Sequence, residues 1–371
     1  MTTTVAGRVD LAGHSLIDVT LDPAAVAMVW HGPGTPHQSF AVPCVSLAAG
    51  DVLVRVEMAT ICGSDVHTVA GHRAAPVPLV LGHEYVGRVV QLGPRPPSGV
   101  DGSVVRVGDR VVWSIMAACG ACARCASGIP QKCLDVRKYG HERLAAGWEL
   151  GGGFATHVHL RAGTAIVRVS ELLDPHVLAP VACGTATARA ALRRAEQVSG
   201  DLFGRSVLVL GAGLIGLSAA AMAADRGAHV VLSDPDADRR ALGERFGAFE
   251  VCGEVGSRRF DVIVEASGSP RAVACALEGV DVGGAVVLVG SVFPTDPVPL
   301  DPEQIVRRLA TVTGVHNYGP ADLADAAGWV QERALAYPLG ALVGPVLPLE
   351  RLDEAIALAR TGTAIRVAVV P

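Results

Sequence analysis

The stretch Val207-Leu-Val-Leu-Gly-Ala-Gly-Leu-Ile-Gly216 decides the fold of this 371-residue chain. Its apolar start predicts a buried strand, and the spacing G-x-G-x-x-G predicts a tight turn into a helix. Glycine at these positions lets the backbone approach a pyrophosphate closely, and the N-terminus of the helix attracts the phosphates. The residues expected at a bound dinucleotide are Gly211, Gly213, Leu214, Ile215 and Gly216.

An acidic residue follows the next predicted strand. The apolar run His229-Val-Val-Leu-Ser233 ends at Asp234, which lies about twenty residues after Gly211. A carboxylate there can accept hydrogen bonds from both hydroxyls of the adenosine ribose, and it would repel a 2′-phosphate. Asp234 therefore favours NAD over NADP, with an ordinary turn residue as the alternative. Arg239 is expected near this ribose, where a guanidinium could accommodate a phosphate.

The region around this motif alternates between strands and helices. Ala- and Arg-rich helical segments separate apolar, strand-like runs, which lie at residues 206–210, 228–232, 261–265 and 285–289. Such alternation predicts βαβ units on a parallel sheet, and thus a doubly wound α/β domain over residues 185–331. The run at 285–289 could also form a sheet edge between subunits.

The remainder of the chain has a β-rich pattern. Between residues 27 and 160, short alternating apolar runs are punctuated by Gly and Pro. Residues 1–25 are expected to form an extension or an edge strand. The tail is expected to return to this domain, so that the α/β domain is inserted within it. The β-rich domain would then comprise residues 1–184 and 332–371.

Composition argues against several classes of protein. The net charge is −5 and there is no long basic run, so no nucleic-acid partner is expected. Residues 206–224 carry no formal charge and are long enough for a membrane-spanning helix. The glycine spacing instead favours a buried strand and helix. The N-terminus lacks the pattern of a signal peptide. Nine cysteines in such a chain are typical of a reducing cytoplasm.

Four cysteines lie close together in a Gly- and Ala-rich stretch. They are Cys119, Cys122, Cys125 and Cys133. Four thiols match the tetrahedral coordination of a structural Zn²⁺, and the short spacers bring all of them within reach of one ion. Two disulfides are the alternative, but they are typical of small exported chains. We expect a closed zinc site that stabilises a loop and performs no chemistry.

Three further segments carry residues of the metal-ligand type, at 61–67, 82–87 and 179–187. Taken singly, each has a plain structural interpretation, because a cysteine is often a small buried residue and a His-Glu pair often lies in a turn. In their order along the chain, however, the motifs resemble the zinc-dependent medium-chain alcohol dehydrogenases from about residue 27 onward. The motifs that carry the resemblance are Cys62-Gly-Ser-Asp-Val-His67, Gly82-His-Glu-Tyr-Val-Gly87, Gly108-Asp-Arg-Val111, the four cysteines and the glycine motif.

The resemblance implies a GroES-like β-rich catalytic domain, and a Rossmann cofactor domain inserted before the C-terminal tail. It also implies a catalytic zinc with one open position. Cys62, His83 and Cys183 would hold this zinc, and Asp65 would accept a hydrogen bond from the second ring nitrogen of His83. Glu84 or solvent is the alternative to Cys183 as third ligand. In the family, a glutamate at the position of Glu84 approaches the metal transiently.

Further roles follow from the same resemblance. Zinc would lower the pKa of a substrate hydroxyl, so that hydride can pass to the nicotinamide. Ser64 and His67 would relay the proton, and Thr187 would face the nicotinamide. Without the resemblance, Ser64 and His67 would be ordinary loop residues. The expected cofactors are two Zn²⁺ per chain and NAD.

The sequence says less about the substrate, which is expected to be a small molecule. The candidate pocket residues are Arg73, Ile115, His141 and Phe154. Cationic residues near these positions, Lys138 among them, could surround an anionic group or could be solvated surface charges. Residues 71–78 and 138–142 also resemble alcohol dehydrogenases associated with phosphonate catabolism, which suggests a small hydroxyalkylphosphonate.

The leading hypothesis is a zinc- and NAD-dependent alcohol dehydrogenase or carbonyl reductase that acts on a small polar alcohol, aldehyde or ketone. A polyol or amino-alcohol dehydrogenase is a second enzymatic interpretation. A catalytically silent NAD-binding protein that keeps only the structural zinc is the alternative of another class. The resemblance implies a homodimer or homotetramer.

Overall fold

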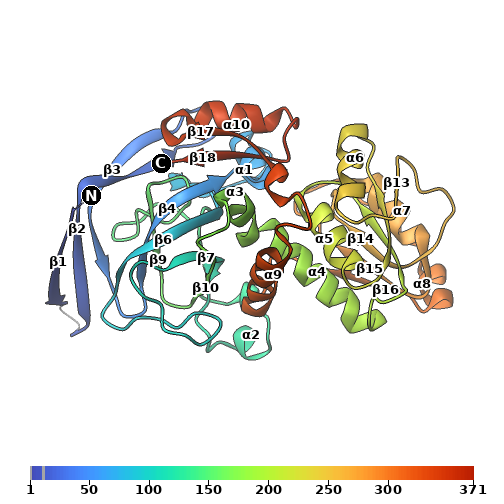
Figure 1. Cartoon of the computed structure of the whole chain (residues 1–371), viewed down its shortest axis with the longest axis horizontal. Coiled ribbons are helices and arrows are strands. Elements are labelled where there is room, and N and C mark those ends of the chain that lie inside the picture. The colour runs from blue at the N-terminus through green and yellow to red at the C-terminus, as the bar shows by residue number, and fades with distance from the viewer. Residues whose placement is uncertain (1, 11–12) are drawn as a thin grey trace. The chain divides into compact units, whose positions relative to one another are not determined.

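The computed structural model describes residues 2–10 and 13–371, which form two compact units (Figure 1). The first unit runs to Cys183 and takes in Gly319–Ala334 and Leu339–Pro371. The second unit comprises Gly184–Tyr318 and Leu335–Pro338. The second unit is thus inserted into the first along the chain.

A six-stranded parallel sheet forms the centre of the second unit. Its order is β13–β12–β11–β14–β15–β16, which places the first strand in the middle and confirms the predicted doubly wound domain. The strands are β11 (Ser206–Leu210), β12 (His229–Ser233), β13 (Glu250–Cys252), β14 (Phe260–Glu265), β15 (Val280–Leu288) and β16 (Thr311–Gly314). The helices of this unit are α4 (Gly184–Ser199), α5 (Leu214–Ala224), α6 (Ala237–Arg245), α7 (Pro270–Gly279) and α8 (Pro302–Arg308).

The structure adds two strands that the sequence pattern did not predict, β13 and β16. Both are short and lack an apolar run, since they read Glu-Val-Cys and Thr-Val-Thr-Gly. The new strand β16 also changes the place of β15, which pairs with β14 on one side and with β16 on the other. The expectation that residues 285–289 form a sheet edge between subunits is therefore wrong.

Two sheets form most of the first unit. The larger sheet has the order β10–β7–β6–β4–β18–β17, with β8 on β7 and β9 on β4, and the smaller has the order β1–β2–β3, with β5 on β2. The expected N-terminal extension is the hairpin of β1 and β2. The strands are β1 (Thr2–Val9), β2 (Ser15–Trp30), β3 (Gln38–Leu47), β4 (Val52–Thr60), β5 (Leu79–Val80), β6 (Glu84–Leu92), β7 (Arg110–Ala117), β8 (Arg137–Lys138), β9 (His157–Leu160), β10 (Thr164–Arg168), β17 (Val343–Pro348) and β18 (Arg366–Val370).

Helices are few in the first unit. The α-helices are α1 (Gly63–Val69), α2 (Ala123–Ala126), α3 (Pro175–Leu178), α9 (Pro320–Arg333) and α10 (Leu352–Arg360), and the 3₁₀ turns are η1 (Pro130–Lys132), η2 (Ala179–Ala182), η3 (Leu339–Leu342) and η4 (Leu349–Arg351). Helix α9 packs on β7, β10 and α3 through an apolar stripe that includes Leu323, Ala326 and Val330. The expected domain boundary at residues 331/332 differs here, because it placed this helix in the other unit. Among the described residues, no helix is long and apolar enough to cross a membrane.

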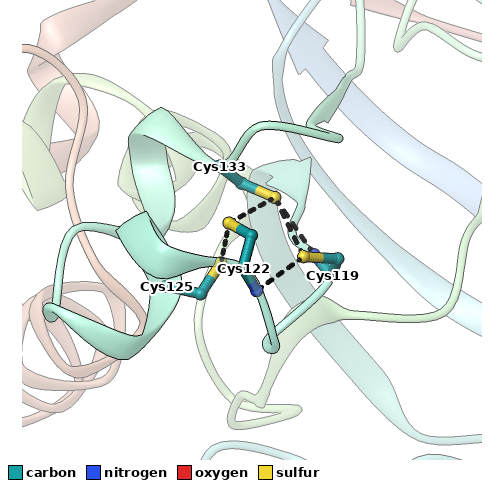
Figure 2. A group of neighbouring side chains, drawn as sticks. All are labelled: Cys119, Cys122, Cys125 and Cys133. Atoms are coloured by element: carbon teal, nitrogen blue, oxygen red, sulfur yellow. Dashed lines mark hydrogen bonds between the residues drawn. The ribbon is translucent and has the colours of Figure 1, made fainter.

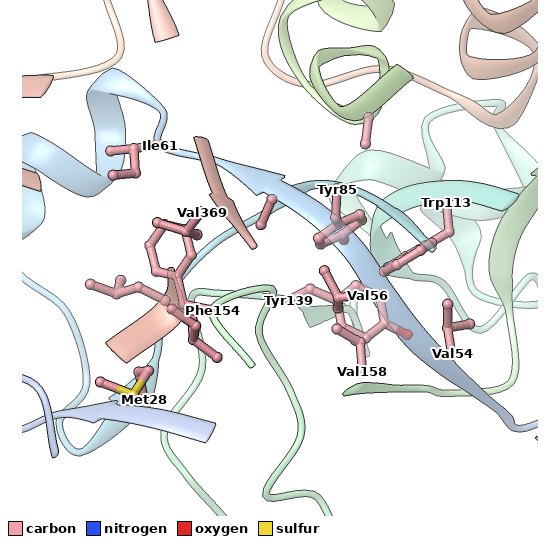
Figure 3. Close-up of a cluster of buried hydrophobic side chains, with 14 of the residues drawn as sticks. Met28, Val54, Val56, Ile61, Tyr85, Trp113, Tyr139, Phe154, Val158 and Val369 are labelled. Atoms are coloured by element: carbon pink, nitrogen blue, oxygen red, sulfur yellow. The ribbon is translucent and has the colours of Figure 1, made fainter. Parts of the chain in front are cut away.

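The larger sheet of the first unit positions the loop after β7 and the segment before β6. The loop after β7 carries α2 and η1 and brings its four cysteines together (Figure 2). Beneath the strands, Tyr85 of β6 stacks on Trp113 of β7 with ring centroids 4.0 Å apart (Figure 3). Phe154 and Tyr139 are fully buried in the same cluster. Because each such side chain contributes about 1.5–3 kcal/mol through burial, this core fixes the start of β6, which His83 directly precedes.

Candidate functional site

The first candidate metal site is the cysteine cluster, which we define as Cys119, Cys122, Cys125 and Cys133 (Figure 2). The Sγ atoms of Cys119 and Cys133 are 3.4 Å apart, those of Cys122 and Cys125 are 3.6 Å apart, and those of Cys122 and Cys133 are 3.9 Å apart. These separations are far too long for disulfides, with S–S bonds of about 2.05 Å. They match the edge of a tetrahedron with Zn–S bonds of about 2.3 Å, which is roughly 3.8 Å. The cluster therefore fits Zn²⁺.

Backbone amides support negative charge in the cysteine cluster. The N–H groups of Cys119 and Asp135 donate to Cys133 Sγ at 3.3 Å in each case. Backbone donors, of which Leu134 is the strongest, lower the pKa of Cys122 to about 6. Desolvation and the neighbouring thiols raise the pKa of Cys125 to about 12. The thiolates thus repel one another, and a divalent cation would relieve this repulsion.

The second candidate metal site is the ligand trio, which we define as Cys62, His83 and Cys183. One ligand atom from each residue lies within 4.8 Å of the other two. Cys62 caps the N-terminus of α1, His83 directly precedes β6, and Cys183 caps the C-terminus of η2, so three separate segments of the first unit converge. Two sulfurs and one imidazole fit Zn²⁺ with a position left open for another ligand.

A buried carboxylate orients the trio. Asp65 Oδ1 lies 3.4 Å from Nδ1 of His83, and its other oxygen accepts a hydrogen bond from the backbone N–H of Cys62 at 3.0 Å. Asp65 and His83 are only 1% and 2% exposed, so neither group can turn to solvent. The contact at Nδ1 leaves Nε2 of His83 for a metal, as in other carboxylate–histidine pairs at zinc sites.

The electrostatics of the trio favour a bound cation. Burial lowers the pKa of His83, but Asp65 and Cys62 raise it well above its usual range. A hydrogen bond with Cys183, together with Arg366 and His83, holds the pKa of Cys62 well below that of a free thiol. The same hydrogen bond and burial raise the pKa of Cys183. The two sulfurs therefore share one proton, which a zinc ion would displace.

Glu84 lies outside the trio, because other groups hold both of its oxygens. Arg366 donates to Oε2 through Nε at 2.7 Å and to Oε1 through Nη2 at 2.9 Å. The hydroxyl of Thr60 donates to Oε2 at 2.6 Å. Nη2 of Arg366 also lies 3.8 Å from Cys62 Sγ. No sequence pattern pointed to Arg366, because this residue is 282 positions from Glu84 and meets it only in the folded sheet.

The two predicted proton-relay residues lie on α1 near the trio. Ser64 Oγ is 3.2 Å from Nε2 of His83. His67, one turn further along α1, has its Nδ1 3.4 Å from Nδ1 of His72. Burial and the neighbouring His72 lower the pKa of His67, so the neutral imidazole is favoured.

The four predicted substrate residues divide into two pairs. Arg73 and His141 come together, with Nη1 of Arg73 3.1 Å from Nε2 of His141, and the ring centroid of His141 is 4.8 Å from that of His83. Ile115 and Phe154 are instead buried, at 4% and 0% exposure, and Phe154 belongs to the hydrophobic core (Figure 3). Ile115 lies in the apolar strand β7 and Phe154 follows three glycines. Neither sequence context distinguishes a pocket residue from a core residue.

In the second unit, the glycine motif forms the predicted strand, turn and helix. Gly211 has φ +103°, a conformation that favours glycine, and a Cβ on Gly216 would lie 1.8 Å from the carbonyl oxygen of Gly211. Leu214 and Ile215 begin α5, and the side chain of Leu214 packs against Gly184 of α4. Thr187 is buried in α4.

A cavity of about 850 Å³ in the second unit adjoins this turn. Its lining includes Gly211, Asp234 and Arg239. Asp234 accepts hydrogen bonds from the backbone N–H of Ala212 at 2.7 Å and of Asp236 at 2.9 Å, which fixes its carboxylate beside the glycine turn. The cavity is large enough for an adenosine half of a dinucleotide.

Glu265, near the glycine turn, is a residue that the sequence analysis missed. It ends β14, is fully buried, and accepts hydrogen bonds at Oε1 from the backbone N–H groups of Ser267 and Gly268, both at 2.8 Å. Ser267 lies against Gly211, so this carboxylate shapes the loop that faces the glycine turn. A glutamate at the end of an apolar strand was the available signal.

Two family models match the chain. The alcohol dehydrogenase GroES-like domain matches residues 48–171, and the zinc-binding dehydrogenase domain matches residues 215–332. An L-threonine 3-dehydrogenase from Anaeromyxobacter dehalogenans (strain 2CP-C) is 34% identical over 295 residues, which cover 74% of this chain and 78% of that protein. A 5-exo-hydroxycamphor dehydrogenase from Pseudomonas putida is 28% identical over 355 residues, which cover 89% and 94%.

Solved structures of dehydrogenases are similar over almost the whole chain. An alcohol dehydrogenase from Thermotoga maritima has a TM-score of 0.85 and 29% identity, and the match covers 94% of this chain and 99% of that one. A zinc-binding dehydrogenase from Sinorhizobium meliloti 1021 bound to NADP has a TM-score of 0.81 and 26% identity over the same shares of the two chains. The chain therefore belongs to the zinc-dependent medium-chain alcohol dehydrogenase family, and it is an oxidoreductase that acts on CH–OH groups with zinc and a nicotinamide dinucleotide.

Proposed function

We propose that this protein interconverts a small polar alcohol and its aldehyde or ketone with NAD, and that the ligand trio holds the catalytic zinc. The convergence of Cys62, His83 and Cys183 from three segments carries this proposal, because a structural role would not require three donors with an open position. A silent protein with only the structural zinc would have no need of this trio.

The chain's own residues hold and orient the reacting groups. A Zn²⁺ at the trio supplies a Lewis acid that lowers the pKa of a hydroxyl, and NAD supplies the acceptor for hydride. Asp65 fixes the ring of His83, and Arg366 stabilises the negative charge of Cys62. Glu84 is proposed to stay paired with Arg366 except for transient approaches to the metal.

Ser64 and His67 are the proposed route for the proton. Ser64 Oγ lies beside His83, so it can accept a proton from a hydroxyl that reacts at the trio. His67 is favoured in its neutral form near pH 7 and can take up the proton at its ring nitrogen. Thr187 is proposed to position the nicotinamide from α4.

Asp234 supports NAD as the preferred cofactor. Its carboxylate is fixed at the end of β12 beside the glycine turn, where it would meet the adenosine ribose. Arg239 lines the same cavity and is the one residue of the predicted set that favours a 2′-phosphate. We propose that the negative charge of Asp234 outweighs it.

The relatives suggest secondary alcohols as substrates. L-Threonine and 5-exo-hydroxycamphor, the compounds in the names of two relatives, are both secondary alcohols. Since L-threonine also carries an amino group, an amino-alcohol substrate is supported as well as a simple secondary alcohol. A hydroxyalkylphosphonate is the finer candidate that residues 71–78 and 138–142 suggest. The free thiols of both metal sites need a reducing environment, which supports a cytoplasmic location. A homodimer or homotetramer stays a prediction.

A substrate panel tests this function. Zinc-loaded protein is mixed with NAD or NADP and with L-threonine, polyols, simple secondary alcohols and hydroxyalkylphosphonates, and reduced cofactor is followed by absorbance. We expect turnover of at least one small polar alcohol, with kcat/KM at least about tenfold higher with NAD than with NADP. Tight NAD binding without oxidation of any alcohol would instead favour the catalytically silent alternative.

A further inference from the structure

Arg73 is held in place by a partly buried network beside the ligand trio. Nδ1 of His141 lies 2.8 Å from the carbonyl oxygen of Tyr139, so this nitrogen carries the proton and donates. Nε2 of His141 therefore has a free lone pair, and Arg73 donates to it through Nη1 at 3.1 Å. An arginine that donates to a neutral imidazole keeps its full charge and most of its five N–H donors.

The network connects this charge to the trio. The ring of His141 packs on that of His83 with a centroid separation of 4.8 Å. A single imidazole thus separates the guanidinium of Arg73 from a zinc ligand. All of these residues belong to the first unit, so their arrangement is fixed within one compact body.

The positive charge here is only partly balanced, because Glu142 acts on Lys138 without forming a direct ion pair. Among the described residues, neither Arg73 nor the ammonium of Lys138 forms an ion pair with a carboxylate, whereas Arg88 and Arg168 on the same unit are paired with Glu171 and Asp101. Lys138 is partly buried, and burial together with Lys132 and Arg73 lowers its pKa.

Glu142, an acidic residue four positions after Lys138, is already occupied. Its Oε1 accepts a hydrogen bond from the backbone N–H of Lys138 at 2.6 Å, and its Oε2 lies 3.5 Å from Nη1 of Arg137. Partly buried cations normally pair with an anion, because desolvated charge is costly. The missing partner of Arg73 and Lys138 is therefore expected to be a ligand.

We infer that Arg73 and Lys138 bind an anionic group of the substrate, a carboxylate or a phosphonate, while the hydroxyl of the same molecule reacts at the ligand trio. The planar guanidinium can donate two parallel hydrogen bonds to either anion, and Lys138 adds a point charge. This inference rests on the proposed function of the trio and names the class of substrate. It predicts a short spacer between hydroxyl and anion, because one imidazole separates the two sites.

Kinetics with matched substrates test the inference. The zinc-loaded enzyme with NAD is given 3-hydroxybutyrate, 2-hydroxypropylphosphonate or the neutral alcohol 2-butanol. Arg73→Ala should raise KM for the better anionic substrate about 10- to 100-fold, because a charged hydrogen bond is lost, and should change KM for 2-butanol less than about twofold. Lys138→Gln should act in the same direction, and Arg73→Lys should restore part of the affinity.

The control is Arg168→Ala, which removes an exposed arginine of the same unit that pairs with Asp101 and should leave all three KM values unchanged. Comparison of 3-hydroxybutyrate with 2-hydroxypropylphosphonate shows which of the two anions binds better. A KM for either anionic substrate that is lower than the KM for 2-butanol supports the inference. Equal effects of Arg73→Ala on anionic and neutral alcohols would overturn it.

A binding measurement separates this inference from the proposed function. Acetate and methylphosphonate carry the anion without a hydroxyl, and calorimetric titration into the zinc-loaded protein follows their binding directly. Weakened binding to Arg73→Ala supports the anion site even if no alcohol is oxidised. Binding that is absent from the wild type, or equally strong in Arg73→Ala, overturns the site and leaves the proposed function of the trio untouched.

Discussion

At the scale of single residues, the charge around His83 depends on partners that the local sequence does not reveal. Asp65 lies on the adjacent helix and could be expected from its spacing to Cys62. Arg366 comes from the C-terminal strand and neutralises Glu84, while it also approaches the sulfur of Cys62. The candidate metal site is therefore supported by an ion pair that joins β18 to the start of β6.

A second buried histidine, His157 of β9, makes stability depend on pH. It is fully buried, its Nε2 has no hydrogen-bond partner among the described residues, and burial together with Arg55 lowers its pKa to about 4. The unfolded chain binds this proton near pH 6.5, so the contribution of neutral His157 is complete above that pH and is lost as the pH falls towards 4.

We therefore expect the wild type to lose about 2 kcal/mol of unfolding free energy through His157 between pH 7 and pH 5. Urea unfolding at both pH values measures this loss, and His157→Leu should show a smaller decrease than the wild type by about that amount. Other buried histidines and the metal sites change equally in both proteins, so they cancel in the comparison. Parallel pH dependence of the two proteins would contradict the assignment.

At the scale of elements, the cysteine cluster organises the loop that carries α2 and η1. A serine hydroxyl is a poor substitute for a thiolate at a structural zinc, so Cys125→Ser should lose the zinc of the cluster. We expect one zinc per chain instead of two, together with faster proteolysis between Cys119 and Asp135. Metal analysis and limited proteolysis measure both effects.

The control for this variant is Cys44→Ser, because Cys44 is an exposed cysteine of β3 outside both metal groups. It should retain two zinc ions and the resistance of the loop to proteases. A Cys125→Ser protein that keeps both ions would show that the cluster does not bind zinc as proposed.

The elements also show which features a sequence can predict. The glycine motif and the cysteine cluster were predictable because every residue of each lies within a short stretch, where spacing determines geometry. Strands β13 and β16 were missed because they are short and lack an apolar run. Helix α9 follows the second unit directly in the sequence, and only the packing of its apolar stripe shows that it belongs to the first.

Contacts between side chains of the candidate site were harder to predict than its candidate metal ligands. Cysteine and histidine in familiar motifs identified the trio, whereas the contact of Arg73 with His141 joins residues 68 positions apart through ordinary loops. Phe154 was expected at a pocket, but Gly82 approaches its ring closely and the ring fills the core. Sequence spacing cannot distinguish these two environments, because both favour an aromatic residue beside glycines.

At the scale of the whole molecule, the two units divide the chemistry. The ligand trio and the proposed anion-binding residues belong to the first unit, and the glycine turn with Asp234 belongs to the second. The chain passes from one to the other directly after the third residue of the trio, since Cys183 caps η2 and Gly184 begins α4. The two family models follow a similar division, since one matches residues 48–171 of the first unit and the other begins at residue 215 in the second.

We propose that the ligand trio holds a catalytic zinc that is distinct from the zinc of the cysteine cluster. The most direct test counts zinc by native mass spectrometry and measures alcohol oxidation in the wild type and in Cys183→Ala. We predict two zinc ions in the wild type. Cys183→Ala should keep one ion and its affinity for NAD, while kcat/KM falls at least about 100-fold. A Cys183→Ala protein that keeps two zinc ions and full activity would contradict the account.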